Sequence, residues 1–341
     1  MANRQRAVVI FPGRGSYAGN ELGYLTRHHA DQMDLIKRLD EVRGQNGATP
    51  VLELDRMEKF SPSKHLPGRN ASNLIYTCAQ ADFRAIDREK IDVVAICGNS
   101  LGWYLTLAAA GALSLDDGAH LVDTMGGLME REGTGGQLLC PVSDEFWHID
   151  NAARDSALQV IEETENAFLS IDLAGTLVLA GDTAALKVLQ DRLKAPDGSS
   201  LIQLPKHAAF HTPLLNDVSK TARSILPSEL FNTPETPIID GCGRIWSPNS
   251  TDVDDLYNYT LHSQIVEPYD FAKSVEVALK EFAPDLLILT GPGGSLGAPV
   301  AQCLISHRWR QITDRESFMK QQSASPYLIS MGREEQRHLA I

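Results

Sequence analysis

Short apolar runs and longer stretches of helical spacing alternate along the chain. The runs lie within predicted strands at positions 7–11, 92–97, 237–240 and 286–290. Such short apolar runs are typical of strands buried on both faces of a sheet. Apolar side chains recur every three or four positions in residues 31–42, 73–86, 115–131, 213–225 and 267–282, which predicts helices there. Alternating strands and helices indicate an α/β fold with a parallel sheet.

The pattern changes in the middle of the chain. Strands are predicted at residues 137–142, 167–172, 176–180 and 200–204, with helices at 150–164 and 183–193. The order strand–helix–strand–strand–helix–strand is that of the ferredoxin-like split unit. We therefore predict a large α/β-hydrolase-like subdomain with a parallel sheet and an inserted ferredoxin-like small subdomain. The large subdomain is expected to hold residues 1–132 and 207–341, and the insert residues 133–206.

Composition and charge remove several function classes. The formal net charge of -13 argues against a nucleic-acid-binding protein, which needs a basic face. The five cysteines are widely spaced and form no C-x-x-C pair, which speaks against a disulfide framework and a zinc site. The longest apolar stretch, 105–115, is too short to span a bilayer, and the first apolar run is too short for a signal peptide. We expect a cytoplasmic protein that binds neither nucleic acid, membrane nor metal.

The residues G-N-S-L-G at 98–102 match the G-x-S-x-G pattern between a predicted strand and a predicted helix. Glycines flank the serine because a tight strand-to-helix turn leaves no room for side chains. The turn would present the Ser100 hydroxyl at the edge of the sheet as a nucleophile. The start of the helix would offer the Leu101 N–H to a developing oxyanion. The alternative is a glycine-rich turn with a solvent-facing serine.

A serine hydroxyl needs a base to take its proton, and the chain holds ten histidines. His211 follows the predicted strand at 200–204 and precedes a predicted helix. His207 and His262 are equally placed competitors. Position along the chain does not decide among these three.

Seven motifs in order resemble those of the malonyl-CoA:acyl-carrier-protein transacylases and the related polyketide synthase acyltransferases. They are F-P-G-R-G-S at 11–16, G-N-S-L-G-W-Y at 98–104, A-A-G-A-L-S at 109–114, E-G-T-G at 132–135, A-A-F-H at 208–211, Q-x-x-x-P at 264–268 and G-P-G at 291–293. The family's fold, with its active site between a large and a ferredoxin-like subdomain, agrees with the predicted organisation.

The resemblance implies a ping-pong acyl transfer. His211 would deprotonate Ser100, which attacks the thioester of an acyl-CoA. The backbone N–H groups of Leu101 and Arg14 would bind the oxyanion, and the backbone carbonyl of Gln264 would orient the histidine. The phosphopantetheine thiol of an acyl carrier protein would then take the acyl group. The family implies no bound cofactor, because coenzyme A enters as the thioester substrate.

One departure from the family bears on the acyl group. Malonyl-type members carry an arginine that holds the free carboxylate in an R-G-x-x-M segment. Here the matching segment is M-G-G-L-M at 125–129, with Met125 at the arginine position. A carboxylate buried against a thioether is unfavourable, so a monocarboxylic acyl group is favoured over malonyl. Arg131 lies six positions further on and off that helix face, which makes it a poor substitute.

Other departures lie beside the nucleophile. Asn99 stands where the family has histidine, and Trp103 where it has glutamate. We expect Asn99, Met125 and Phe210 at the substrate pocket. Trp103 is assigned to the same pocket, although its position on the helix after the serine favours the core over the pocket wall. The Arg14 side chain replaces a glutamine, and we expect it at the surface; binding of a CoA phosphate or an unusual acyl group is the alternative.

Three rival functions remain. A hydrolase with the same Ser–His pair would release acyl groups from carrier protein to water. An unrelated α/β-hydrolase would need its histidine near the C-terminus, where His307 and His338 lie. A third rival is an inactive relative that binds carrier protein. Basic residues near 206 and 307–310 are candidates for carrier-protein contact, and the segment from Ser323 is expected to pack loosely or to contact another chain.

Overall fold

The computed structural model describes residues 4–45 and 47–341; residues 1–3 and 46 of the expected large subdomain lie outside this part. Its larger sheet has the strand order β11-β10-β1-β2-β7-β8, and all neighbouring strands are parallel except β7 and β8. These strands are β1 (Gln5–Phe11), β2 (Ile91–Gly98), β7 (Ile238–Ile239), β8 (Ile245–Trp246), β10 (Leu286–Leu289) and β11 (Leu328–Ser330). The mixed α/β fold with a parallel sheet is as predicted.

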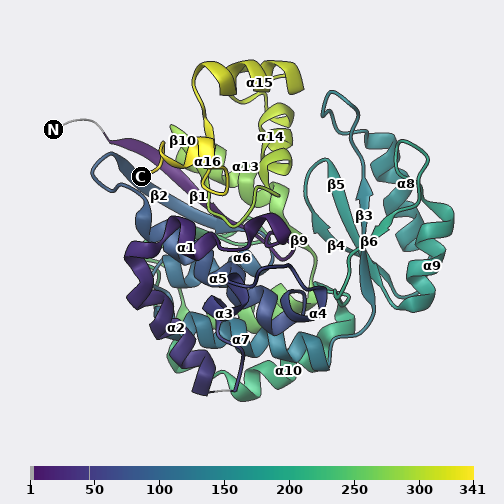
Figure 1. Cartoon of the computed structure of the whole chain (residues 1–341). Helices are drawn as coiled ribbons and strands as arrows, with labels where there is room; N and C mark the ends of the chain where they lie inside the picture. Colours follow the sequence, from purple (N-terminus) through teal and green to yellow (C-terminus); the bar gives the residue numbers. More distant parts are fainter. Residues whose placement is uncertain (1–3, 46) are drawn as a thin grey trace.

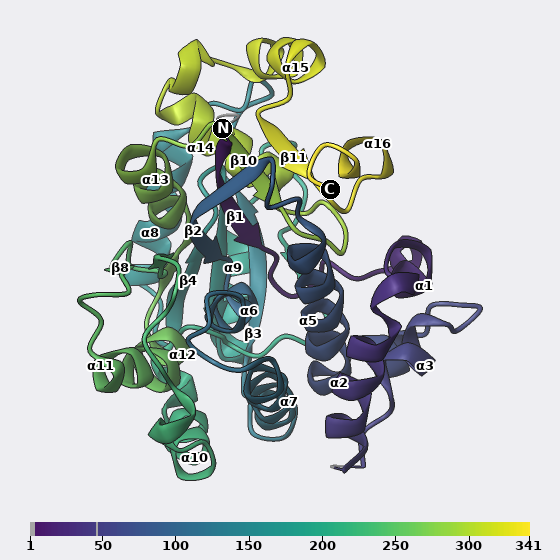
Figure 2. The ribbon, with the colours of Figure 1, turned by 90° about the vertical axis from the view of Figure 1, so that its left-hand side faces the viewer.

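The central strands are buried on both faces. Every side chain from Ala7 to Phe11 is fully buried, as the continuous apolar run predicts. Helices α13 (Phe271–Phe282) and α14 (Gly297–Ser306) lie on one side of these strands, and α5 (Gly68–Ala85) lies on the other (Figure 2). The parallel strands β1, β2 and β10 therefore form the centre of the larger hydrophobic core.

A second, five-stranded sheet lies beside the first (Figure 1). Its order is β6-β3-β5-β4-β9, with β3 (Gly136–Pro141), β4 (Ala167–Asp172), β5 (Thr176–Gly181), β6 (Ile202–Gln203) and β9 (Tyr269–Asp270). Helices α8 (Asn151–Glu162) and α9 (Thr183–Arg192) complete the ferredoxin-like unit, which has its own small core. Strand β9, which comes from beyond the expected insert, pairs with β4 in parallel. The division of the chain at 132/133 and 206/207 stays a prediction.

The longer of the other helices are α2 (Met33–Gln45), α6 (Leu101–Ala109), α7 (Leu115–Arg131), α10 (Asn216–Ile225) and α15 (Arg315–Ala324). Helices α2, α7 and α10 follow the predicted apolar spacing with small shifts at their ends, whereas α15 and most of the short segments were not predicted. Short helical segments are η1 (Gly19–Glu21), α1 (Tyr24–His28), η2 (Ala30–Gln32), α3 (Val51–Asp55), α4 (Pro62–His65), η3 (Pro213–Leu215), η4 (Ser228–Leu230), α11 (Val253–Asn258), η5 (Tyr259–Ser263), α12 (Gln264–Val266), η6 (Trp309–Gln311) and α16 (Glu334–Arg337). No helix of the described residues is long and apolar enough to cross a membrane.

The helix predicted at 267–282 begins later than expected. Pro268 follows the end of α12, and the chain becomes extended through β9 before α13 starts at Phe271. The side chain of Asp270 accepts a hydrogen bond from the Lys273 N–H and so caps the new helix. Because the helix is interrupted at Pro268, Gln264 lies in the short helix α12 and Tyr269 lies in strand β9 of the small sheet.

The prediction that the segment from Ser323 packs loosely is wrong, whereas its alternative, contact with another chain, stays a prediction. Strand β11 pairs with β10 at the edge of the larger sheet, and α16 follows it. Arg337 in α16 is 6% exposed and makes a 2.6 Å ion pair with the fully buried Asp82 of α5. The C-terminal segment is therefore part of the core.

Candidate active site

Ser100 occupies a sharp turn between β2 and α6. Its backbone has φ 55° and ψ −107°, outside the ordinary regions for a non-glycine residue. A Cβ atom at Gly98 would lie 2.4 Å from the Gly102 backbone, and one at Gly102 would lie 2.5 Å from the Phe11 carbonyl oxygen. Both flanking positions thus require glycine, as expected for a nucleophile elbow.

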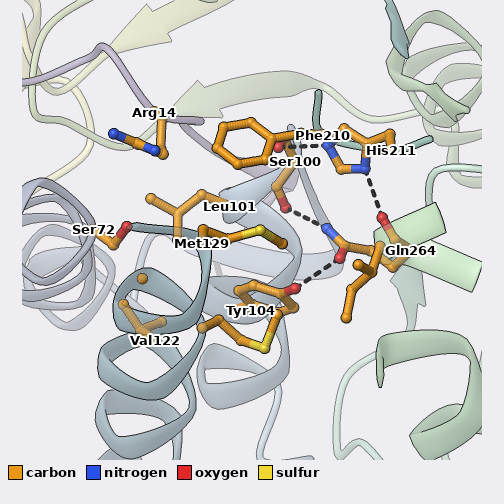
Figure 3. A pocket seen from close by; sticks show the side chains of 13 residues that line it. Arg14, Ser72, Ser100, Leu101, Tyr104, Val122, Met129, Phe210, His211 and Gln264 are labelled. Carbon is orange, nitrogen blue, oxygen red and sulfur yellow. Dashed lines mark hydrogen bonds between the residues drawn. The ribbon is translucent and has the colours of Figure 1, made fainter. Parts of the chain in front are cut away.

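The structure brings three of the predicted residues into one hydrogen-bonded chain (Figure 3). The Ser100 Oγ lies 2.7 Å from Nε2 of His211, and Nδ1 of His211 lies 2.6 Å from the Gln264 main-chain oxygen. A carbonyl can only accept, so Nδ1 carries the proton and Nε2 is free to accept the serine proton. The amide side chain of Gln264 also donates to the Ser100 carbonyl oxygen over 3.2 Å.

The other two candidate histidines are engaged elsewhere. His207 lies with Nδ1 2.7 Å from the Gln137 side-chain oxygen, and Nδ1 of His262 lies 3.2 Å from Ser219 Oγ. Neither contacts Ser100 in the described part of the chain. Of the three candidates, only His211 meets the geometric requirement for a base, which position along the chain had left undecided.

Burial controls the charge of His211. Desolvation lowers the pKa of this imidazole to about 4, although the hydrogen bond to the Gln264 carbonyl opposes the shift. At neutral pH the ring is therefore uncharged and able to accept a proton. A strand from the small sheet also holds its neighbour, because Ser170 Oγ of β4 donates to the Phe210 carbonyl over 2.7 Å.

The two predicted oxyanion donors lie beside the same turn. Leu101 is the first residue of α6, so its N–H lies at the positive end of the helix. The loop that carries Arg14 packs tightly on the turn, since a Cβ atom at Gly13 would lie 2.9 Å from the Asn99 carbonyl oxygen. The roles of Leu101 and Arg14 as oxyanion donors stay predictions.

A pocket with about 450 Å³ of unoccupied space, part of it open to solvent, lies in front of Ser100 and His211. Most of its wall is apolar and is formed by Leu101, Val122, Met125, Met129, Phe210 and Ile265. Polar groups come from Arg14, Ser72, Tyr104 and Gln264. The pocket therefore suits a mainly apolar group with a few polar contacts.

Met125 lines this pocket and is 2% exposed, so the expected pocket position agrees with the structure. Arg131 does not take its place, because its side chain is 64% exposed and lies 3.9 Å from Glu132. Among the described residues, the one cationic side chain on the pocket wall is Arg14.

Contrary to expectation, the Arg14 side chain is not at the free surface. It lines both this pocket and a more polar cleft beside it, which also contains Glu130, Lys206 and His207. Its Nη2 donates to the Leu66 carbonyl oxygen over 3.1 Å, and its guanidinium lies 5.5 Å from the centre of the Phe210 ring. Burial lowers the pKa of Arg14 to about 10, and Glu130 opposes this shift.

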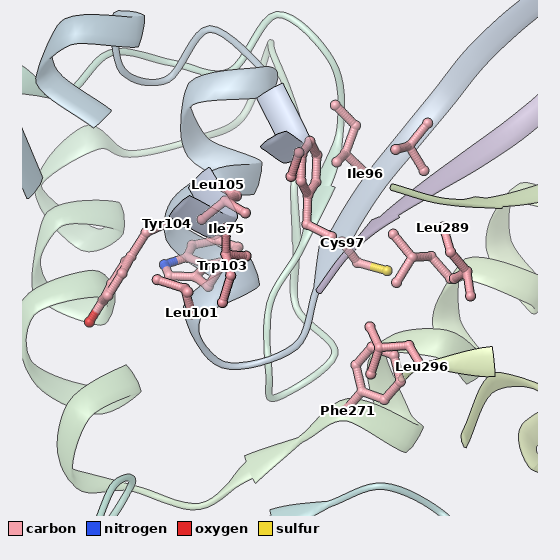
Figure 4. Packing of buried hydrophobic residues seen from close by; sticks show 14 of the residues in the cluster. Ile75, Ile96, Cys97, Leu101, Trp103, Tyr104, Leu105, Phe271, Leu289 and Leu296 are labelled. Carbon is pink, nitrogen blue, oxygen red and sulfur yellow. The ribbon is translucent and has the colours of Figure 1, made fainter. Parts of the chain in front are cut away.

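Two residues expected at the pocket do not line it. The Trp103 ring is fully buried in the core (Figure 4), and its Nε1 donates to Thr260 Oγ1 over 3.0 Å. Asn99 is 8% exposed and packs against the Gly13 loop instead. Trp103 thus faces the core, whereas the next residue, Tyr104, reaches the pocket.

Sequence reasoning missed Tyr104, Ser72 and Met129 as pocket residues. The spacing contains a signal for two of them, because Tyr104 lies four residues after Ser100 and Met129 four residues after Met125. Residues four apart on a helix share a face. Ser72 comes from a different helix, α5, and its position depends on how that helix packs on α7.

Comparisons with known proteins agree with this fold. No protein-family model matches the chain. A malonyl CoA-acyl carrier protein transacylase of Haemophilus influenzae is 24% identical over 302 residues, which are 85% of this chain and 89% of that protein. The non-reducing polyketide synthase nscA of Trichophyton tonsurans is 25% identical over 281 residues, 80% of this chain but 15% of the synthase.

Solved structures extend the match to the whole chain. The malonyl-CoA:ACP transacylase of Synechocystis sp. superposes with a TM-score of 0.76 at 18% identity, over 98% of this chain and 99% of that one. The acyltransferase domain from the second module of the salinomycin polyketide synthase superposes with a TM-score of 0.74 at 19% identity, over 99% of this chain and 72% of that one. The homologues and structural neighbours of the chain are thus malonyl-CoA:acyl-carrier-protein transacylases and polyketide synthase acyltransferase domains, the family that its motifs resemble.

Proposed function

We propose that the chain is an acyltransferase that moves an acyl group through an ester on Ser100 to the phosphopantetheine thiol of an acyl carrier protein. The donor is an acyl-CoA or an acylated carrier protein. The observation that carries this proposal is the chain of hydrogen bonds from Ser100 through His211 to the Gln264 carbonyl. The names of the relatives, which describe transfer between malonyl CoA and acyl carrier protein, support it.

In the first half-reaction, His211 Nε2 takes the proton of Ser100 as Oγ attacks the thioester carbonyl. The negative oxygen is stabilised by the Leu101 and Arg14 N–H groups. The carbon–sulfur bond then breaks, and His211 returns its proton to the departing thiolate. In the second half-reaction, the carrier-protein thiol loses its proton to His211, attacks the ester and releases Ser100 in its protonated form.

The finer part of the proposal concerns the acyl group. Met125 lines the pocket where malonyl-type relatives would have arginine, and Met129 lies one helical turn further along the same wall. Neither thioether offers a hydrogen-bond donor to a carboxylate. A monocarboxylic acyl group is therefore the preferred substrate class, in place of malonyl.

Intact-mass measurement after incubation with acetyl-, butyryl-, malonyl- and longer acyl-CoAs tests this function. We expect one acyl mass on the wild-type chain and none on Ser100→Ala. Added carrier protein should then receive that group faster than water does. Faster loss to water would favour the hydrolase, and preferential loading of malonyl would contradict the argument from Met125. Absence of any acyl-enzyme, with acylated carrier protein also tried as donor, would favour the inactive relative.

A further inference from the structure

Two polar side chains on one wall of the pocket have donors with no partner among the described residues. Ser72 is 3% exposed, and its hydroxyl makes no hydrogen bond there. Nε of Arg14 is buried and also unpaired. Figure 3 shows both side chains on the side of the pocket away from His211 and Gln264.

The guanidinium of Arg14 is already held in place. One amino group donates to the Leu66 carbonyl, and the plane lies close to the Phe210 ring, where a cation is attracted by the π electrons. Phe210 immediately precedes His211, so the cation is fixed relative to the proposed base. A ligand would meet a preformed donor and would not have to order a free arginine.

Nε of Arg14 is a buried donor without an acceptor, which is unfavourable unless a ligand supplies one. The acyl group is placed to do so, because Ser72 and Arg14 line the same pocket as Ser100. Ser72 does not line the outer polar cleft, whereas Arg14 lines both. Both residues therefore line the pocket that an acyl group on Ser100 would enter.

We propose that Arg14 and Ser72 bind an oxygen atom of the acyl chain, so that the preferred substrate is a monocarboxylic acyl thioester with a hydroxyl or keto oxygen near the thioester. This inference rests on the proposed function, since it assumes that an acyl group occupies the pocket. It deepens that function by naming the substrate class.

A nearby acidic side chain reduces the advantage that a carboxylate would have over a neutral oxygen at Arg14. Glu130 lines the outer cleft together with Arg14, and its carboxylate attracts the guanidinium. Glu130 therefore offsets part of the attraction that Arg14 would have for a second carboxylate, whereas it has little effect on a hydroxyl or keto oxygen. The remaining wall near Met125 and Met129 offers no further donor to a carboxylate.

The test compares 3-hydroxybutyryl-CoA with butyryl-CoA, which have the same chain length. The measured quantity is the ratio of their kcat/KM values for acylation of Ser100, followed by intact mass. On the wild-type chain we expect a ratio on the order of ten, as for a hydrogen bond to a charged group. Arg14→Met, which keeps the backbone N–H, should lower the ratio to about one, and Ser72→Ala should lower it partly.

Arg131→Met is the matched control, because that arginine is exposed and outside the pocket; its ratio should equal that of the wild type. A wild-type ratio near one would overturn the inference. So would a ratio unchanged by Arg14→Met, even if both rates fell equally, since Arg14 would then contact the thiol arm. Fastest loading by malonyl-CoA would overturn it as well. If no thioester acylates Ser100, the proposed function itself fails, which is a distinguishable result.

Discussion

Replacement of Arg337 by methionine tests the role of the C-terminal segment in the core. Asp82 is fully buried, and Nη1 of Arg337 lies 2.6 Å from its carboxylate. Tyr24 and the Gly291 N–H also donate to this carboxylate, over 2.7 and 2.6 Å. Burial alone would raise the pKa of Asp82, but contact with His29 and the attraction of Arg337 lower it. The carboxylate is therefore charged in the folded protein and depends on its partners.

The expected loss follows from leaving this charge without its arginine. Removal of one partner of a buried ion pair costs about 3–5 kcal/mol. Since the hydrogen bonds from Tyr24 and Gly291 remain, we expect Arg337→Met to lower the free energy of unfolding by about 3 kcal/mol. That is a large part of the about 5–15 kcal/mol typical of a folded domain.

Urea unfolding at pH 7, followed by tryptophan fluorescence, measures this change. In the double variant with Asp82→Asn the buried charge is absent. The loss of unfolding free energy in the double variant should therefore be smaller than the sum of the losses in the two single variants. Arg333→Met is the matched control on an exposed side chain, with an expected change within about 0.5 kcal/mol. A loss below about 1 kcal/mol for Arg337→Met, or full additivity with Asp82→Asn, would refute the reasoning.

Three further predictions concern the site. Because burial lowers the pKa of His211 to about 4, the base is active above that pH; the kcat/KM for acylation should be level from about pH 5.5 to 7.5 and fall only as the pH drops towards 4. A titration near 6.5 in the pH profile would show that the imidazole is not desolvated as described. Met125→Arg should raise malonyl loading relative to butyryl loading by at least about tenfold, because it adds a bidentate carboxylate partner on the pocket wall; an unchanged loading ratio by intact mass would contradict the assigned alignment. Trp103→Phe removes the hydrogen bond to Thr260 in the core, so thermal unfolding should show a loss of about 1–3 kcal/mol while the order of acyl-CoA preference stays the same. A changed order of acyl-CoA preference would indicate that Trp103 contacts the acyl group.

The elements that could be predicted from sequence are those with strong local signals. The strand at Ala7–Phe11 is uniformly apolar, and the helix at Leu115–Arg131 has both its spacing and its Ser114 cap in the sequence. Strands β9 and β11 have two and three residues, too few for a period to be visible. Their positions depend on pairing with β4 and β10, which are distant along the chain.

The candidate site divides in the same way. Ser100 could be found from its motif, but the choice among His207, His211 and His262 needed the resemblance to a family. The place of the Arg14 side chain could not be predicted, because it depends on packing against Phe210, almost two hundred residues away. The assignment of Trp103 to the pocket is wrong and its core alternative is right. Neighbouring residues on α6 face opposite environments, and the rotation of that helix could not be predicted from sequence alone.

Strand β4 of the small sheet contacts both the residue before the proposed base and the segment that follows Gln264. Ser170 holds the carbonyl before His211, and the next residue, Ile171, is paired with Tyr269, a few residues after Gln264. Tyr269 in turn donates to the Gly98 carbonyl in the serine turn. For protein engineering, strands β3 to β6 and residues 264–270, which include β9, are therefore one transferable unit. A chimera that exchanges residues 136–203 alone, with strands β3 to β6, should fold around a foreign β4 and lose the spacing between the base and its carbonyl partner.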